Sequence, residues 1–211
     1  MLTLYFSPGA CSMASHIGLE ESGAQYEKRP TLLPKGEHKT EAYLKINPRG
    51  KVPALAVDGQ VITENTAILT YVGKRFPEKK LFPTDAIGEA RCISTMAWFS
   101  NSVHPLYTHT LRPERYAEDP AAHATVKETN RKSFFEALKE IDGLLAGKQW
   151  ILGDQFTVAD GYALVFYGWG LRAGLPLQEL KNYTAWKDRM VQRPAVRKVL
   201  EEEKNVILEQ K

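Results

Sequence analysis

The stretch that decides the fold is Ser7-Pro8-Gly9-Ala10-Cys11-Ser12, because it joins two segments of different character. Residues 2–6 before it are apolar and prone to β-structure, which predicts a strand. Residues 13–19 after it carry apolar side chains at helical spacing, which predicts a helix. Pro8 and Gly9 mark the turn between the two segments. The chain is therefore expected to begin with a strand, a tight turn and a helix.

The turn brings Cys11 and Ser12 to the start of the predicted helix. Backbone N–H groups at a helix start lack intrahelical partners, and the helix dipole is positive there. Both effects stabilise a thiolate and lower the pKa of a cysteine. We therefore expect Cys11 to be reactive and partly ionised near neutral pH. From position alone, the alternative is that Cys11 is a small buried residue that closes the turn.

Length and composition exclude several classes of protein. The chain has 211 residues, of which 43% are hydrophobic, so it can form one or two domains without a disulfide or a metal. The net charge is +3, and no dense cluster of Lys and Arg indicates a nucleic-acid partner. Cys11 and Cys92 are the two cysteines and lie far apart in the sequence. This argues against a disulfide framework and fits a reducing compartment.

The sequence carries no sign of export or membrane insertion. No basic region followed by a long apolar run stands at the N-terminus, which argues against a signal peptide. No apolar run approaches the length that spans a bilayer. We therefore expect a cytoplasmic protein without a membrane partner.

The first part of the chain, residues 1–77, mixes strand and helix patterns in the order β-α-β-α-β-β-α. Asp58-Gly59 lies between two β-prone segments and is a strong hairpin signal. Asn47-Pro48 ends a short helix. The strands are expected at residues 2–6, 26–31, 52–57 and 60–62, and the helices at residues 13–22, 41–46 and 66–76.

A charged linker bounded by prolines, residues 78–85, separates this part from a second one that contains helices only. Residues 86–211 are expected to form this all-helical domain. Pro105 should bend or end its first long helix, and the spacing of Thr157 and Asp160 predicts a capping box. The helices are expected at residues 87–111, 120–145, 158–169, 183–192 and 195–203.

Four motifs occur in the order and spacing of a known family. They are Pro8-Gly9-Ala10-Cys11-Ser12, Asn47-Pro48-Arg49-Gly50-Lys51-Val52-Pro53-Ala54-Leu55, Thr63-Glu64-Asn65-Thr66-Ala67-Ile68 and Phe156-Thr157-Val158-Ala159-Asp160. Together they resemble the cytosolic glutathione transferases, and the first resembles the bacterial beta class. The resemblance implies an α/β plus all-α chain, with a thioredoxin-like domain followed by a helical-bundle domain. It also implies a homodimer that uses glutathione as co-substrate, a small hydrophobic electrophile as second substrate, and no other cofactor or metal.

The resemblance assigns one group of residues to the middle and the glycine end of glutathione. Pro53 stands where this fold places a cis proline, which leaves the N–H and C=O of Val52 to pair with the ligand. Lys51 directly precedes Val52 and is expected to face the glycine carboxylate. Lys35 and His38 are further candidates for that carboxylate, and a solvated basic loop is the equal alternative for both.

Glu64 and Asn65 resemble the residues that bind the γ-glutamyl end of glutathione. They precede a predicted helix, so free N–H groups point toward a bound carboxylate. The Glu64 side chain can accept from the ammonium group, and the Asn65 amide can donate to the carboxylate. The alternative is a helix N-terminus whose acid only complements the dipole.

The sulfur of glutathione is expected to lie near Cys11. By resemblance, His104 reaches across from the helical domain, where a neutral imidazole can accept a proton or donate a hydrogen bond. Pro105 follows His104 and departs from the family pattern. Ser12 and Tyr5 are the hydroxyl alternatives to the Cys11 thiol. We expect Cys11, Ser12 and His104 to be catalytic, with Tyr5 beside glutathione.

His109, Arg112 and Arg115 follow His104 on the same segment. They are candidates for the wall of the second-substrate pocket. We interpret them instead as a surface salt-bridge cluster, which is a common use of such residues. Cys92, in the middle of a predicted helix, is expected to be an inert buried thiol.

Two enzymatic modes stay open. In conjugation, the protein stabilises the glutathione thiolate for attack on an electrophile. In thiol exchange, Cys11 forms a mixed disulfide with glutathione. Pro8 and Ala14 stand where a C-x-x-C pair would need its second cysteine, which excludes a dithiol mechanism at this site. The alternative class is a non-catalytic binding or regulatory protein of the same fold, and the presence of Cys11, Val52-Pro53 and Glu64 argues against it.

Overall fold

A computed structural model describes residues 1–209 of the chain. Its first part forms one sheet in the order β2-β1-β3-β4, in which β1 and β2 are parallel and the other pairs are antiparallel. The predicted order β-α-β-α-β-β-α is confirmed. The elements are β1 (Leu2–Phe6), α1 (Met13–Ser22), β2 (Tyr26–Pro30), α2 (Glu41–Leu44), β3 (Ala54–Val57), β4 (Gln60–Thr63) and α3 (Asn65–Arg75).

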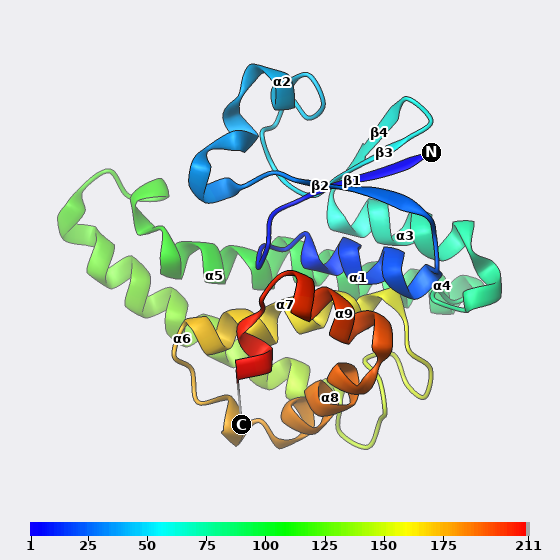
Figure 1. The fold of residues 1–211 in the computed structure, drawn as a ribbon. Helices are drawn as coiled ribbons and strands as arrows, with labels where there is room; N and C mark the ends of the chain where they lie inside the picture. The colour runs from blue at the N-terminus through cyan, green and yellow to red at the C-terminus, as the bar shows by residue number, and fades with distance from the viewer. Residues whose placement is uncertain (210–211) are drawn as a thin grey trace.

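The sheet is held by apolar residues that alternate along β1 and β3. Leu4 and Leu55 are fully buried and pack with Ile68 and Val72 of α3. Figure 1 shows α1 and α3 on the side of the sheet that faces the other helices, with α2 on the opposite side. The hairpin predicted at Asp58-Gly59 is present. Both residues have positive φ angles, as a type I′ turn requires.

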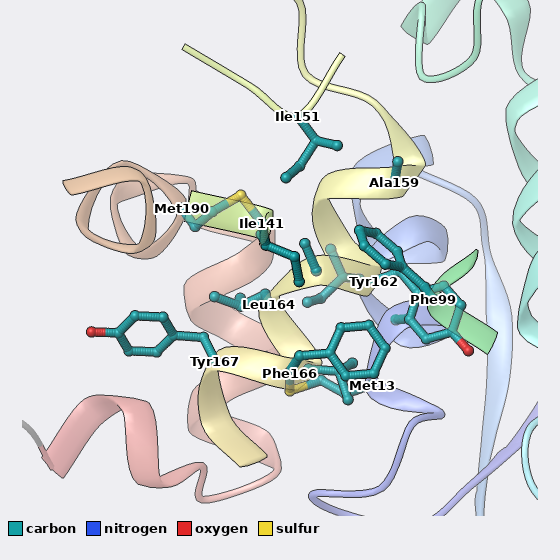
Figure 2. Close-up of a cluster of buried hydrophobic side chains, with 14 of the residues drawn as sticks. Met13, Phe99, Ile141, Ile151, Ala159, Tyr162, Leu164, Phe166, Tyr167 and Met190 are labelled. Carbon is teal, nitrogen blue, oxygen red and sulfur yellow. The ribbon is translucent and has the colours of Figure 1, made fainter. Parts of the chain in front are cut away.

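The second part of the chain is helical, as predicted. Its most buried element is α7, whose residues from Val158 to Gly170 are all buried. A helix that is apolar on every side needs other helices around it, and Figure 2 shows side chains of α7 packed with residues from α1 and the neighbouring helices. The elements are α4 (Ala86–Trp98), α5 (His104–Leu111), α6 (His123–Leu144), α7 (Val158–Arg172), α8 (Lys181–Gln192) and α9 (Pro194–Glu202).

The two parts share one core. Met13 and Ile17 of α1 belong to the same buried cluster as the side chains of α7. Gly161 makes this close packing possible, because a Cβ at that position would lie 3.1 Å from a methyl group of Ile17. The capping box predicted at Thr157 and Asp160 is present, and the Asp160 carboxylate accepts the Thr157 N–H at 2.8 Å.

The segment that was expected to form one helix over residues 87–111 is divided. A π-helix, Phe99–Val103, connects α4 to α5. Pro105 has no N–H, so it cannot donate to a carbonyl in the preceding turn of a regular helix, and the wider π turn directly before it accommodates that loss. The division places His104 at the first residue of α5.

Other departures from the predicted elements are small. Short 3-10 turns occupy Leu33–Lys35 and Glu37–Lys39 within the expected loop, and a further one, Val206–Glu209, was not predicted. Within residues 1–209, no helix has both the length and the apolar character needed to cross a membrane.

Candidate active site

A cleft of about 720 Å³ lies between the two parts of the chain. One wall, here called the thioredoxin-like wall, includes residues 7–11, 49–53 and 63–65. The other, the helical wall, consists of residues of α5, the turn after it, and Trp169 and Arg172 from the end of α7. A cavity of this size accommodates a tripeptide and a small second molecule.

Cys11 lines the cleft and is partly exposed. Its Sγ lies 3.4 Å from the carbonyl oxygen of Val52, to which the thiol donates. Burial raises the pKa of Cys11 to about 12. A hydrogen bond from Asn65 opposes this rise and the negative charge of Glu64 adds to it. The thiol is therefore protonated at neutral pH.

The expectation that Cys11 is partly ionised is thus wrong for the protein without ligand. The helix α1 begins at Met13, as expected, so Cys11 lies in the turn just before it. At Cys11 the cost of removing the charge from water is the largest contribution to the pKa, and it outweighs the contributions that favour the thiolate.

The turn that carries Cys11 is held from the helical part of the chain through Gly9. The N–H of Gly9 donates to Glu203 Oε2 at 2.7 Å, and its carbonyl accepts from Trp169 Nε1 at 3.0 Å and Arg172 Nη1 at 2.8 Å. Gly9 has φ of 70°, and a Cβ there would lie 2.1 Å from Arg172 Nη2. Only glycine fits this position. The sequence pattern gave no sign of these contacts.

Glu203 is itself fully fixed by its neighbours. Its side chain is buried, and Oε1 lies 2.9 Å from His16 Nδ1. Because Oε2 accepts from Gly9, one carboxylate joins the end of α9 to both the turn and α1. We define Glu203, Trp169 and Arg172 as the Gly9 clamp.

Three of the expected site residues lie outside the lining of the cleft. Ser12 is fully buried, and its hydroxyl accepts the Ser7 N–H at 3.0 Å and donates to the Ser7 carbonyl at 3.2 Å. Tyr5 packs edge-on against Tyr43, with ring centroids 5.9 Å apart. Lys35 is exposed at the end of a 3-10 turn. This geometry gives no support to a direct role for Ser12, Tyr5 or Lys35.

The peptide bond between Val52 and Pro53 is cis, which confirms the expectation. The Val52 N–H has no hydrogen-bond partner within residues 1–209. The Val52 carbonyl is not free, however, because it accepts from the Cys11 thiol. Lys51 is exposed in the cleft, and its backbone carbonyl accepts from Tyr43 and Asn47, each at 2.7 Å. These two bonds hold the segment that presents the Val52 N–H.

Glu64 and Asn65 both line the cleft but differ in what they offer. Glu64 is exposed, with φ of 70°, and its carboxylate lies 3.5 Å from Arg49. A non-glycine residue in this backbone region is strained, and such strain is concentrated at functional sites. Asn65 is buried; its Oδ1 accepts from Ser15 at 2.7 Å and its Nδ2 donates to the Cys11 carbonyl at 3.0 Å. The expected donation from the Asn65 side chain to a ligand is therefore not supported.

His104 lines the cleft and packs edge-on against Trp169, with ring centroids 4.8 Å apart. Burial lowers the pKa of His104 to about 4, and the charge of Lys51 contributes to the shift. The imidazole is therefore neutral at pH 7. Within residues 1–209, it makes no hydrogen bond to Cys11.

The residues after His104 are not the salt-bridge cluster that was expected. His109 bonds to Asn130, with 3.0 Å between Nδ1 and Oδ1, and does not line the cleft. Arg112 and Arg115 do line it and have no carboxylate partner within residues 1–209. Trp169, an aromatic residue that could belong to the core or to the second-substrate wall, lines the cleft. Lys39, Arg49 and Arg172 also line it, and the sequence pattern identified none of these three as a site residue.

A second group of ionisable residues lies outside the cleft, where ligand atoms of His16, Glu20 and Glu202 come within 4.8 Å of one another. The ammonium group of Lys28 already lies between the two carboxylates, 3.3 Å from Glu20 and 2.6 Å from Glu202. We describe this group as an ion-pair cluster between α1, β2 and α9.

Comparison with known proteins identifies the fold. Residues 1–74 match the N-terminal domain of glutathione S-transferases, and residues 96–194 match their C-terminal domain. The chain is 32% identical to glutathione S-transferase GstA of Escherichia coli O157:H7 over 205 residues, which cover 96% of this chain and 98% of the relative. The chain belongs to the glutathione S-transferase family. The expected enzyme class and the thioredoxin-like plus helical fold are confirmed.

Solved structures of glutathione S-transferases resemble this chain over nearly its whole length, and one of them is a bacterial beta class enzyme. The fold is similar to a sphingomonad glutathione S-transferase complexed with glutathione, with a TM-score of 0.85, 34% identity, and coverage of 96% of this chain and 98% of that one. It is equally similar to the bacterial beta class enzyme of Sphingomonas chungbukensis, with a TM-score of 0.85, 32% identity and coverage of 95% and 98%. The expected resemblance of this transferase to the bacterial beta class is confirmed.

Proposed function

We propose that this transferase binds glutathione along the thioredoxin-like wall and joins its sulfur to an electrophile that lies against the helical wall. The observation that carries the proposal is the convergence of three groups on Cys11 within one cleft. They are the free N–H of Val52, the exposed carboxylate of Glu64 and the N-terminus of α3.

Each of these groups suits one part of glutathione. The backbone N–H groups at the start of α3 suit the γ-glutamyl carboxylate, and Glu64 suits the ammonium group on the same carbon. The Val52 N–H suits the carbonyl next to the cysteinyl sulfur, as in an added strand. Lys51 suits the glycine carboxylate. This placement brings the sulfur of glutathione toward Cys11. A solved relative that is complexed with glutathione supports the choice of ligand.

We assign Cys11 the role of a hydrogen-bond donor. A thiol with a raised pKa keeps its proton at neutral pH, so it can turn from the Val52 carbonyl to the sulfur of glutathione. A donated hydrogen bond stabilises the glutathione thiolate, which is the nucleophile in conjugation. His104, neutral and in the same cleft, is available to accept a proton.

Thiol exchange is the second candidate. The observation in its favour is that Cys11 is partly exposed in the cleft whereas Cys92 is buried. The thiolate of Cys11 would attack one sulfur of oxidised glutathione, form a mixed disulfide and release the other glutathione as a thiolate. We place this activity second because the raised pKa of Cys11 leaves little thiolate at neutral pH.

The test combines binding with turnover. Calorimetry should show binding of glutathione, and the purified protein should accelerate the displacement of chloride from 1-chloro-2,4-dinitrobenzene by glutathione. Binding without turnover of this or any electrophile in a panel would favour the non-catalytic alternative. Incubation with oxidised glutathione should add at most one glutathione to the intact mass, at Cys11.

The remaining expectations stay part of the proposal. They are a thioredoxin-like domain over residues 1–77, a linker over residues 78–85, a helical domain over residues 86–211, a cytoplasmic location and a homodimer. The homodimer is expected from the resemblance of the motifs to the family. Sedimentation that shows only monomer at micromolar concentration would contradict it.

A further inference from the structure

One end of the cleft is lined by positive side chains from two distant segments. Lys39 comes from the 3-10 turn Glu37–Lys39, Arg112 follows α5, and Arg115 ends the 3-10 turn after it. Figure 1 shows the blue segment that precedes α2 above the end of α5. Burial lowers the pKa of His38, and the charges of Lys39, Arg112 and Arg115 lower it further. We call Lys39, Arg112 and Arg115 the cationic end of the cleft.

The charges of the cationic end are not compensated by the protein. Within residues 1–209, none of the three cations makes an ion pair. Glu64 is the only carboxylate residue among the described residues that line the cleft, and it lies against Arg49. Like charges gathered in a cleft with apolar walls raise the local concentration of anions. The missing negative charge is therefore expected to come from a ligand.

The neighbours of these cations indicate what kind of anion fits. Leu44, Leu111 and Tyr116 line the same cleft and are 37%, 50% and 50% exposed, so their apolar surfaces are available for contact. A guanidinium group presents a planar pair of donors that matches a carboxylate. The combination suits an organic molecule with an apolar body and a carboxylate, rather than an inorganic ion.

Glutathione does not account for the cationic end under the proposed function. Its γ-glutamyl carboxylate is assigned to the start of α3, and its glycine carboxylate to Lys51. The cationic end then faces the helical side of the cleft, where the second substrate is expected. If glutathione used these cations instead, their loss would weaken glutathione itself, and kinetics can separate the two cases.

We propose that the preferred second substrate is an electrophile that carries a carboxylate, held by Lys39, Arg112 and Arg115. This inference rests on the proposed conjugation and specifies its substrate class. In an aromatic substitution, the sulfur of glutathione forms a bond to the ring carbon, the carbon–chlorine bond breaks, and chloride leaves with its electron pair. The thiol proton goes to solvent, and the carboxylate of the electrophile takes no part in the bond changes.

The test uses two electrophiles that differ at one substituent, a carboxylate in 4-chloro-3-nitrobenzoate and a neutral carboxamide in 4-chloro-3-nitrobenzamide. Each kcat/KM is divided by the uncatalysed rate constant of the same compound with glutathione. The ratio of benzoate to benzamide should exceed ten in the parent protein. In the double variant Arg112→Gln, Arg115→Gln the ratio should fall about 10- to 100-fold, as expected for the loss of charged hydrogen bonds, and 0.5 M KCl should also reduce it.

A matched control is Arg197→Gln, because Arg197 is an exposed residue of α9 that pairs with Glu201 far from the cleft lining. It should leave the ratio unchanged. A ratio near one in the parent protein would overturn the inference while leaving conjugation in place. A rise in the KM for glutathione in the double variant, without a change in the ratio, would also overturn it.

Failure of the proposed function is recognised separately. If neither electrophile is turned over, calorimetry with 4-chloro-3-nitrobenzoate in the presence of S-methylglutathione measures the anion site directly. Binding of the benzoate that is lost in Arg112→Gln, Arg115→Gln would support the anion site without catalysis. Equal affinity for the benzoate and the benzamide would overturn it.

Discussion

The two walls of the cleft are made of different kinds of groups. The thioredoxin-like wall combines the side chains of Cys11, Lys51 and Glu64 with backbone groups: the Val52 N–H, the start of α3 and the turn that is held at Gly9. The helical wall presents side chains, among them His104, Arg112 and Arg115. The cis peptide bond before Pro53 and the positive φ of Gly9 each require a particular residue type. Such residues form a motif that can be recognised in the sequence.

The comparison also shows that the walls depend on each other. The Gly9 clamp reaches from α7 and the end of α9 to the turn of Cys11, so the helical part holds the wall that carries the motif. Substitutions on the helical wall are therefore expected to change which second substrate is accepted. Substitutions in the Gly9 clamp are instead expected to disturb the turn that carries Cys11. The following predictions test this division.

The largest effect is expected at the clamp. Glu203→Ala removes the acceptor of the buried Gly9 N–H and the partner of His16, and should lower the free energy of unfolding by about 3 kcal/mol. Urea unfolding measures this, and kcat/KM for conjugation should fall with it. The control Glu201→Ala removes an exposed pair with Arg197 and should cost less than about 0.5 kcal/mol. Equal stability of the two variants would refute the clamp.

The next effect concerns the ionisation of Cys11. With its pKa raised to about 12 by burial, the thiolate fraction should rise about hundredfold between pH 7 and pH 9. Alkylation by iodoacetamide, followed by mass spectrometry, should accelerate in proportion and show no plateau. The Cys11→Ala variant should give no adduct, because Cys92 is buried. A plateau near pH 8 would mean that the turn stabilises the thiolate after all.

A smaller effect is expected at Glu64. Glu64→Ala should raise the dissociation constant of glutathione about tenfold, because a hydrogen bond to a charged group contributes about 1.5–3 kcal/mol and tenfold is about 1.4 kcal/mol. Calorimetry measures it. Glu41→Ala is the control, since Glu41 is an exposed acid that pairs with Lys45 outside the cleft. An unchanged constant for Glu64→Ala would remove this residue from the glutathione site.

The smallest effect is expected at His104 on the other wall. Burial lowers its pKa to about 4, so it stays neutral from pH 5.5 to pH 8, and its titration should leave no step in kcat/KM over that range. His104→Gln should lower conjugation only severalfold and keep the shape of the pH profile. A step near pH 6.5 that disappears in His104→Gln would show that the histidine is solvated and titrates normally.

Local chemistry in the sequence was sufficient for most of the fold. Asp58-Gly59 predicted the β3–β4 hairpin, and Thr157 and Asp160 predicted the cap of α7. Pro105 predicted an irregularity in the long helix, but the π-helix Phe99–Val103 that lies before it was not predicted. Each of these signals acts between residues a few positions apart. The resemblance of the motifs then predicted the family and the cis peptide bond between Val52 and Pro53.

The site was less predictable because its properties arise through space. Glu203 contacts Gly9 across 194 positions of sequence, and Arg112 and Arg115 meet the turn of Lys39 from another part of the chain. The start of α1 suggested a low pKa for Cys11, but burial by residues from both parts of the chain raises it. The sequence thus specified the turns, caps and motif wall, which depend on short-range backbone preferences. Tertiary packing decided the pKa values of Cys11 and His104 and brought the cations of the cleft together. The reason is that desolvation and Coulomb interactions depend on distance in space rather than on order along the chain.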